Sequence, residues 1–348
     1  MKYSLIALSL LCLTACKADV QTEPPKTDGF KLEFPSEPPK TDGFKLEFPL
    51  DCTLGETCWL MNYVDHDTRD GSVRDAKCEA RSYDGHKGTD VAIRDWSSTA
   101  QGVAIIAPAA GVVLGVRDGE SDQFPTEAQK ALIKKRGREC GNGVRIDHGQ
   151  GWVTQFCHMK KGSVSVAYGA EIAAGTKLGD VGMSGITDHP HVHMTLRKDE
   201  AVVDPYTGRQ ASQSCGLEAA APLWKDKTPY NGFGIFDAGF SDSAPDFKAI
   251  ARGQRATHPQ DTSPAFIFYV NYFGARAGDR VELIIRQPDG QVFSKKAMLQ
   301  DRTKARQAYF IGRKNSKGRF MSGQWSAEVT VYRKDTGERQ RAERKITL

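Results

Sequence analysis

The chain has 348 residues, of which 39% are hydrophobic and 26% are charged. This length suits two medium-sized domains, because single hydrophobic cores stop growing at about 250–300 residues. The net charge of +5 arises from 48 basic and 43 acidic residues, which are interspersed along the chain. A nucleic-acid partner is therefore not indicated.

The first residues are expected to direct export. Lys2 precedes an apolar run from Leu5 to Leu13, which is too short to span a bilayer and is typical of a secretion signal. The sequence Leu-Thr-Ala before Cys16 resembles a bacterial lipobox. We therefore expect a signal peptide at 1–15 and an acylated Cys16 that anchors the protein in the cell envelope. Lys17 after the cysteine favours the outer membrane, with the protein facing the periplasm.

A duplicated segment follows the lipobox. Residues Glu23–Pro35 recur unchanged as Glu37–Pro49, and both copies are rich in proline and charge. We predict that 16–50 is an extended tether, which at about 3.1 Å per residue reaches roughly 100 Å. The alternative that Phe30–Phe34 adds a strand to the next domain stays open.

Residues 51–224 are predicted to form a β domain. Short runs of alternating apolar and polar residues stand between glycines, which is typical of strands. These runs are Asp90–Ile93, Val103–Ile106, Gly111–Val116, Val144–Asp147, Trp152–Phe156 and His191–Leu196. One helix is predicted at 126–135, with Thr126 as its N-cap, as an insertion packed on the sheet.

Residues 225–348 are also predicted to be β-rich. Their apolar runs are Ala265–Val270, Val281–Ile285 and Trp325–Tyr332, and a turn at 335–337 closes a last hairpin. Several short strands with regular turns favour a small immunoglobulin-like β-sandwich. The fold class is therefore all-β, although a sandwich by itself indicates no function.

The cysteines agree with export. Without Cys12 of the signal and Cys16, an even number remains, which predicts disulfides outside the cytosol. The six are Cys52, Cys58, Cys78, Cys140, Cys157 and Cys215. Many pairings are open, but Cys140 and Cys157 flank two β-like runs joined by a turn at 148–151, so we expect these two to pair across a hairpin.

Three segments carry histidines in a pattern that suggests a metal site. In an extended chain His86 and Asp90 lie about 13 Å apart, whereas two ligands of one zinc lie within roughly 4 Å of each other. The segment must therefore bend, and Gly85 and Gly88 permit this. His191 and His193 share one face of a strand at about 7 Å, so one is able to bind a metal while the other reaches its water. His158 follows the run that ends at Phe156.

With these segments the sequence resembles the lysostaphin-like, or LytM-type, zinc endopeptidases, over roughly Tyr83 to Tyr206. Four separate segments occur in the family's order, which makes chance agreement negligible. The matching residues are His86 and Asp90, Ile106–Val113, Asp147–Gly149 leading to His158, Gly179–Gly185, and His191–His193 followed by Asp204-Pro205.

The resemblance implies a LytM-type antiparallel catalytic sheet and one zinc ion held by His86, Asp90 and His193. Three protein ligands leave the fourth tetrahedral position to water, which is typical of a catalytic site. His158 and His191 are then the catalytic residues, as general base and as stabilisers of the oxyanion. Which of the two takes which role stays open.

The sequence departs from the family at three positions. Phe156 stands where the family usually has tyrosine, and Met194-Thr195 where it has Phe-Glu, which leaves the hydrogen bonds that orient the ligands in doubt. Of the other histidines, His148 is expected in a turn, His66 and His258 are expected to be solvated, and His189 is a candidate to line a substrate groove.

The predicted function is hydrolysis of peptide bonds in peptidoglycan stem peptides or cross-links by attack of a metal-bound water. The expected partners are these peptides and, through Cys16, a membrane. One alternative is a non-catalytic lipoprotein that binds the cell wall or activates a separate hydrolase. Another is cleavage of glycine-rich proteins. The bond that is cut and the oligomeric state are not predicted.

Overall fold

The computed structural model describes residues 43–348 apart from 212–214, 218–219, 231 and 255. The expected signal peptide, Cys16 and the first copy of the duplication lie outside the described residues. Residues 38–348 form one compact unit. Among the described residues, no helix is long and apolar enough to cross a membrane.

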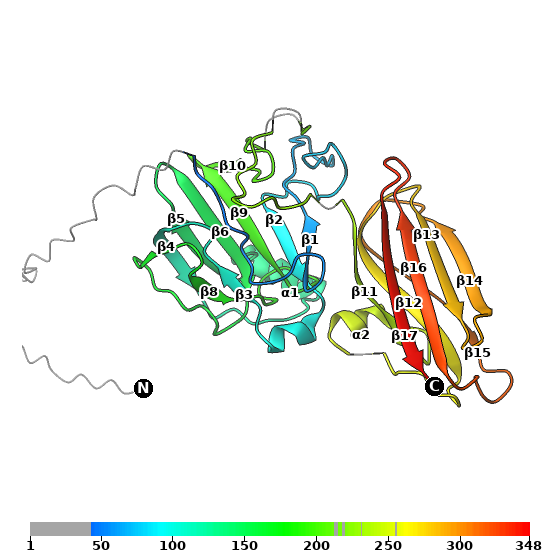
Figure 1. Ribbon diagram of the computed structural model, residues 1–348. Helices are drawn as coiled ribbons and strands as arrows, with labels where there is room; N and C mark the ends of the chain where they lie inside the picture. Colours follow the sequence, from blue (N-terminus) through cyan, green and yellow to red (C-terminus); the bar gives the residue numbers. More distant parts are fainter. Residues whose placement is uncertain (1–42, 212–214, 218–219, 231, 255) are drawn as a thin grey trace, which may run out of the picture. The chain divides into compact units, whose positions relative to one another are not determined.

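An antiparallel sheet dominates the N-terminal part of the described chain (Figure 1). Its strands run in the order β1-β2-β9-β6-β5-β4-β7, with β10 paired to β9. They are β1 (Cys58–Asn62), β2 (Thr89–Ile93), β4 (Gly111–Arg117), β5 (Asn142–Asp147), β6 (Trp152–Met159), β7 (Glu171–Ile172), β9 (His191–Lys198) and β10 (Ala201–Val203). A second small sheet pairs β3 (Ala104–Ile106) with β8 (Lys177–Asp180).

The period of two along β9 separates the core from the candidate site. Val192, Met194 and Leu196 are fully buried in the first hydrophobic core, while the intervening His191 and His193 project from the opposite face. The same sheet places β2 and β6 on either side of β9. Residues from three strands and one loop are thereby able to meet over a single face.

Residues 43–50 differ from the tether that the sequence predicts. Leu46 and Leu50 are buried in the first core, Leu46 forms a parallel bridge with Trp224, and Leu50 forms an antiparallel bridge with Ile105. The apolar residues of this second repeat copy explain the packing, because their burial is favourable. Residues 43–50 are therefore part of the packed fold and not of an extended tether, and this copy takes the strand-like role left open for the first.

The predicted helix is present as α1 (Glu127–Lys135), and Thr126 and Gln129 form a capping box at its start. The sequence also predicts that this helix packs on the sheet. The helix buries none of its residues, so this part of the prediction is wrong. A 3-10 helix, η1 (Trp96–Ala100), follows β2. Asp95 caps η1 by accepting the Ser98 N–H.

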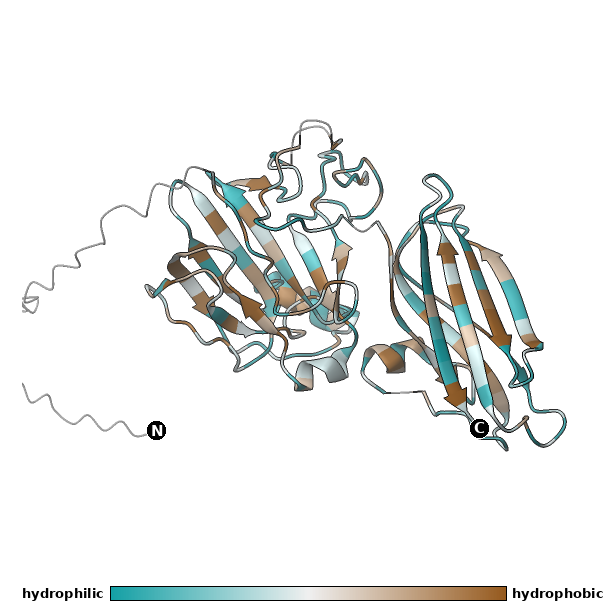
Figure 2. Cartoon of the chain, viewed as in Figure 1, coloured by the Kyte–Doolittle hydropathy of each residue, from teal (hydrophilic) through white to brown (hydrophobic). Residues whose placement is uncertain are grey.

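Two antiparallel sheets make up the C-terminal part (Figure 1). One has the order β11-β12-β15 and the other β14-β13-β16-β17. The strands are β11 (Gly234–Ser241), β12 (Ala265–Ala275), β13 (Arg280–Arg286), β14 (Val292–Leu299), β15 (Lys304–Lys314), β16 (Gln324–Tyr332) and β17 (Arg339–Thr347), and a short helix, α2 (Phe247–Ala251), follows β11. Figure 2 shows apolar and polar residues alternating along several of these strands.

The two C-terminal sheets share a second hydrophobic core around the fully buried Trp325. Phe266 of β12 and Val281 of β13 contribute to this core from opposite sheets. The all-β fold is thus confirmed, and packed sheets agree with a sandwich. The immunoglobulin-like assignment stays a prediction.

Candidate metal centre

Strand pairing brings the three predicted ligands together. Asp90 on β2 lies directly opposite His193 on β9, and His86 reaches them from the loop before β2. The ligand atoms are His86 Nε2, Asp90 Oδ1 and His193 Nδ1. They lie 3.1 Å (His86–Asp90), 3.0 Å (His86–His193) and 2.8 Å (His193–Asp90) apart.

These separations fit a single metal ion. Zinc–nitrogen and zinc–oxygen bonds of about 2.0–2.2 Å place tetrahedral ligands roughly 3.3 Å from each other, and the three atoms require only small shifts to meet that geometry. His86 Nδ1 donates its proton to the Tyr63 carbonyl at 2.7 Å, so Nε2 of the neutral ring carries none. With His86 neutral, its Nε2, Asp90 Oδ1 and His193 Nδ1 together form a donor set for a cation.

Each ligand has a second partner that fixes its orientation. Besides the bond from His86 to Tyr63, His193 Nε2 donates to Thr195 Oγ1 at 2.9 Å, and Asp90 Oδ2 accepts from Asn62 at 2.9 Å. Such outer contacts are a regular feature of metal sites. Thr195 replaces the family's usual glutamate without leaving the His193 ring unsupported. No pattern in the sequence marks Asn62, the last residue of β1, or Tyr63 after it as partners of the ligands.

Two glycines shape the bend from His86 to Asp90, as the spacing predicts. Gly85 has a φ of +70°, in the left-handed region that favours glycine. At Gly88 a Cβ would lie 2.7 Å from the His193 ring and 2.6 Å from the Met194 carbonyl. Only glycine lets this segment approach β9 closely enough for His86 to reach His193.

His158 and His191 lie beside the ligand cluster. His191 Nδ1 donates to the His189 carbonyl at 2.8 Å, which leaves Nε2 free 3.6 Å from Asp90 Oδ1. His158 Nδ1 donates to the Ser184 carbonyl at 2.8 Å, and the two rings lie 4.7 Å apart. Both imidazoles therefore keep one nitrogen available for a proton.

The backbone at His158 is strained, with a φ of +63°. A left-handed conformation is uncommon for residues other than glycine and costs of order 1–3 kcal/mol. Gly182 donates to the His158 carbonyl, and His158 donates to that of Cys140. These bonds hold the residue at the end of β6 and aim its ring toward His191.

The charges at the site suit a cation bound by neutral imidazoles. Burial opposes ionisation of Asp90, but His86 and His191 hold the pKa of its carboxyl well below the usual range. Burial lowers the pKa of His193, and burial together with His191 and His193 lowers the pKa of His158 to about 3. Burial opposes protonation of His86, but the charge and hydrogen bond of Asp90 raise the pKa of this ring, so a cation bound here would take the place of its proton.

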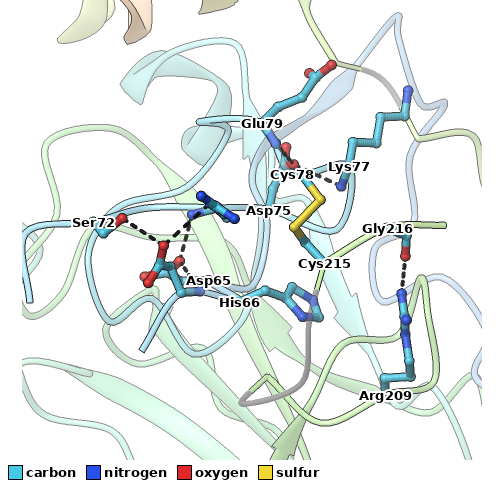
Figure 3. Close-up of a disulfide and its surroundings, with 12 residues drawn as sticks. Asp65, His66, Ser72, Asp75, Lys77, Cys78, Glu79, Arg209, Cys215 and Gly216 are labelled. Carbon is cyan, nitrogen blue, oxygen red and sulfur yellow. Dashed lines mark hydrogen bonds and ion pairs between the residues drawn. A yellow bond between two sulfur atoms is a disulfide. The ribbon is translucent and has the colours of Figure 1, made fainter. Parts of the chain in front are cut away.

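The loop between β1 and His86 is held by hydrogen bonds and by a disulfide, Cys78–Cys215 (Figure 3). Asp65 accepts the N–H of Gly85 at 2.9 Å and donates its own N–H to the His86 carbonyl at 2.9 Å. The disulfide Cys78–Cys215 joins this loop to the segment after β10. The disulfide and the hydrogen bonds of Asp65 thus support the backbone at His86.

The sequence predicts that His66 is solvated. This prediction is wrong, because His66 lies in the same loop and is only 6% exposed. Its Nε2 lies 2.9 Å from Asp204 Oδ2, and both side chains are buried. A buried polar group requires such a partner. The Asp204 that the family resemblance identifies is therefore a structural partner of His66.

The remaining histidines lie outside the ligand cluster. His148 sits in the turn after β5, between the Ala110 carbonyl and Thr154, and His258 is exposed. His189 is fully buried, and its Nε2 donates to the Ile93 carbonyl at 2.8 Å.

All six cysteines of the described chain form disulfides. The predicted pair Cys140–Cys157 is confirmed, and the others are Cys52–Cys58 and Cys78–Cys215.

Two curated proteins are similar to part of the chain. The "Cell division protein DipM" of Caulobacter vibrioides is 32% identical over 107 residues, which are 30% of this chain and 15% of that protein. An "Uncharacterized metalloprotease" of Haemophilus influenzae is 27% identical over 135 residues, 39% of this chain and 23% of that protein. The chain thus spans less than a quarter of the length of either relative.

Among solved structures, a zinc-containing peptidase from Vibrio cholerae is 18% identical, with 49% of this chain and 40% of that chain covered and a TM-score of 0.32. A putative M23 peptidase from Pseudomonas aeruginosa is 27% identical, with 49% and 52% covered and a TM-score of 0.30. The sequence profile of Peptidase family M23 matches residues 84–205, the segment that contains His86, Asp90, His158, His191 and His193. The chain therefore carries an M23 peptidase domain of the LytM type.

Proposed function

We propose that the protein is a zinc-dependent endopeptidase that hydrolyses peptide bonds in peptidoglycan stem peptides or cross-links. The observation that carries this proposal is the convergence of two imidazoles and one carboxylate, whose ligand atoms lie within 4.8 Å of one another, beside two further histidines. Three protein ligands with an open position are typical of catalytic rather than structural zinc sites.

A zinc ion at this site would activate a water molecule and polarise the scissile carbonyl. The chain's own residues hold and move the proton. His191, whose Nδ1 proton is held by the His189 carbonyl, presents Nε2 to accept a proton from the attacking water. His158, fixed by Ser184, presents its own Nε2 to the same space. With both Nδ1 protons held by carbonyls, each neutral ring accepts a proton at Nε2, and the ring that has accepted it is then able to donate to the oxyanion.

The cell-wall substrate is supported by two independent points. The expected signal peptide and the acylated Cys16 would place the enzyme in the cell envelope beside peptidoglycan. The similarity to a protein named as a cell division protein agrees with a substrate in the cell wall. Anchorage is tested with Cys16→Ser, which should move the protein from the detergent phase to the aqueous phase of an envelope extract; unchanged partitioning contradicts the anchor.

Mass spectrometry of fragments released from purified peptidoglycan tests the activity. The zinc-loaded wild type should release soluble peptides, and His193→Ala should release none. His258→Ala is the matched control, because His258 is exposed and is not part of the ligand cluster. Fragments that are identical with wild type and His193→Ala contradict the mechanism. A protein that binds zinc but releases no peptides favours the alternative of a non-catalytic lipoprotein. A protein that cleaves only glycine-rich proteins favours the alternative of a peptidase with such substrates.

A further inference from the structure

A cavity of about 540 Å³ lies where the turn before β9, the start of α1, helix α2 and strand β15 meet. Phenylalanine rings form part of its wall, from Phe124, Phe236 and Phe247. Its described lining has five cationic side chains and one carboxylate: Arg94, Lys130, Lys248, Arg252, Arg306 and Asp188.

The walls of the cavity belong to one packed unit. Trp59, Met61 and Ala92 of the M23 side form a buried cluster with Phe273 of β12, and Phe236 packs against it. Arg81 is buried between the two parts and donates to the carbonyls of Leu60 and Gly232. Buried apolar and hydrogen-bonded contacts of this kind join the walls of the cavity.

Arg306 anchors the cavity to the turn that leads into β9. Its guanidinium donates to His189 Nδ1 at 2.8 Å and to Asp188 Oδ2 at 2.9 Å. Burial, and after it the charge of Arg306, lowers the pKa of His189 to about 3. The ring is therefore neutral, with Nε2–H donating to the Ile93 carbonyl and Nδ1 accepting from Arg306.

The cavity borders the metal centre. Asp188 and His189 come just before His191, and the His189 carbonyl orients the His191 ring. Tyr83, whose ring lies 4.3 Å from the His86 ring, also lies near Asp188. Burial, followed by the charges of Asp90 and Asp188, raises the pKa of its hydroxyl. The turn that lines the cavity therefore also orients a ring at the metal centre.

The cations of the lining are only partly neutralised. Arg94 pairs with Asp95 and Lys130 with Glu127. Arg252 lies over the Phe124 ring at 5.3 Å, and Lys248, like Arg252, forms no ion pair among the described residues and is exposed. A concave site with excess positive charge attracts anions, and guanidinium groups match carboxylates in geometry.

We propose that this interdomain basic cavity binds a free carboxylate of the peptide substrate and so directs the M23 domain to acidic peptides. The inference rests on the proposed peptidase function and gives the C-terminal sandwich a part in substrate selection. The phenylalanine rings would pack against the aliphatic part of the same peptide, as apolar walls with a few polar groups do in ligand sites.

The test compares one synthetic cross-linked stem peptide with free carboxylates and the same peptide with amidated carboxylates. For Lys248→Gln combined with Arg252→Gln, we expect KM for the acidic peptide to rise about tenfold, as is typical of a lost charge-assisted contact. Its kcat and the KM of the amidated peptide should not change. Lys295→Gln combined with Lys296→Gln, on β14 and outside the cavity, is the matched control.

Equal KM values of the wild type for both peptides overturn the proposal, and so does an equal change in the control variant. If zinc-loaded wild type cleaves neither peptide, the peptidase proposal fails separately. Calorimetric titration with the acidic peptide then decides about the cavity: weaker binding by the Lys248/Arg252 variant than by the control supports it, and equal binding contradicts it. Thermal melts of both variants, which alter exposed side chains, check that the fold is intact.

Discussion

The M23 side and the C-terminal sandwich bury different kinds of residues. The first core is accompanied by buried ionisable groups that include His86, Asp90, His158 and His191. The second core is built of apolar strands around Trp325. The described part of the sandwich buries no histidine, and its buried Asp279 and Arg333 pair with each other at 3.5 Å. Burial of polar groups is costly unless they are hydrogen-bonded or bind a metal. The difference indicates that the first region is organised for chemistry and the second for stability and positioning.

The largest expected effect comes from a ligand. Asp90→Asn removes the only carboxylate among the three predicted ligands, so we expect peptide release to fall at least about a thousandfold, in line with the loss of a group that supports charge at a catalytic centre. The protein should also lose its zinc in dialysis. Elemental analysis and the peptidoglycan assay measure both quantities. Retention of one zinc per chain with full activity would remove Asp90 from the site.

A core substitution in the sandwich should behave in the opposite way. Trp325→Ala truncates a fully buried ring and is expected to lower the free energy of unfolding by about 3–5 kcal/mol. Urea denaturation measures this loss. Zinc content at a temperature where the variant is folded should remain that of the wild type. Zinc loss under those conditions would show that the core of the sandwich also supports zinc binding on the M23 side.

A smaller effect is expected for the outer partner of His193. Thr195→Val keeps the shape of the side chain but removes the hydroxyl that accepts from His193 Nε2. Loss of such a partner lowers metal affinity by about 10–100-fold, which competition with a zinc chelator measures. Thr330→Val on β16 is the control. An unchanged affinity in Thr195→Val would mean that β9 alone orients the ring.

The last comparison concerns pH. The pKa of His189 is about 3 in the folded protein, against 6.5 for a free histidine. Between these values the unfolded chain binds a proton that the folded chain rejects. The free energy of unfolding should therefore fall as pH drops from about 6.5 toward 3, by at most about 1.4 kcal/mol per pH unit from this group.

His189→Gln is the comparison for this prediction, because its amide is able to donate to Ile93 and accept from Arg306. Urea unfolding of metal-free protein at pH 7, 5.5 and 4 should show a shallower loss of stability for the variant. A pH dependence equal to that of the wild type excludes His189 as its source.

The sequence predicts well where a local pattern exists. The alternation at His191–Leu196 predicts β9 and the common face of its histidines, and Thr126 predicts the start of α1. The family resemblance names the three residues that the structure brings together. The pairing of Cys140 with Cys157 follows from the hairpin between them.

Features that depend on distant partners could not be predicted. His66 stands in a loop without periodicity, so its burial against Asp204 follows only from the fold. Arg306 meets Asp188 across 118 residues, and no local pattern marks either residue. No regular apolar alternation marks strand β14, because exposed polar residues interrupt it. Prolines and charges surround Leu46, so its sequence does not indicate that it packs in the core.

X-ray absorption spectroscopy of the zinc-reconstituted wild type identifies the atoms bound to the metal. We predict one zinc per chain with two imidazole nitrogens, one carboxylate oxygen and one exchangeable oxygen at about 2.0–2.2 Å. A fourth ligand from the protein that an added inhibitor does not displace, or a zinc that persists with the same ligands in His193→Ala, would contradict it.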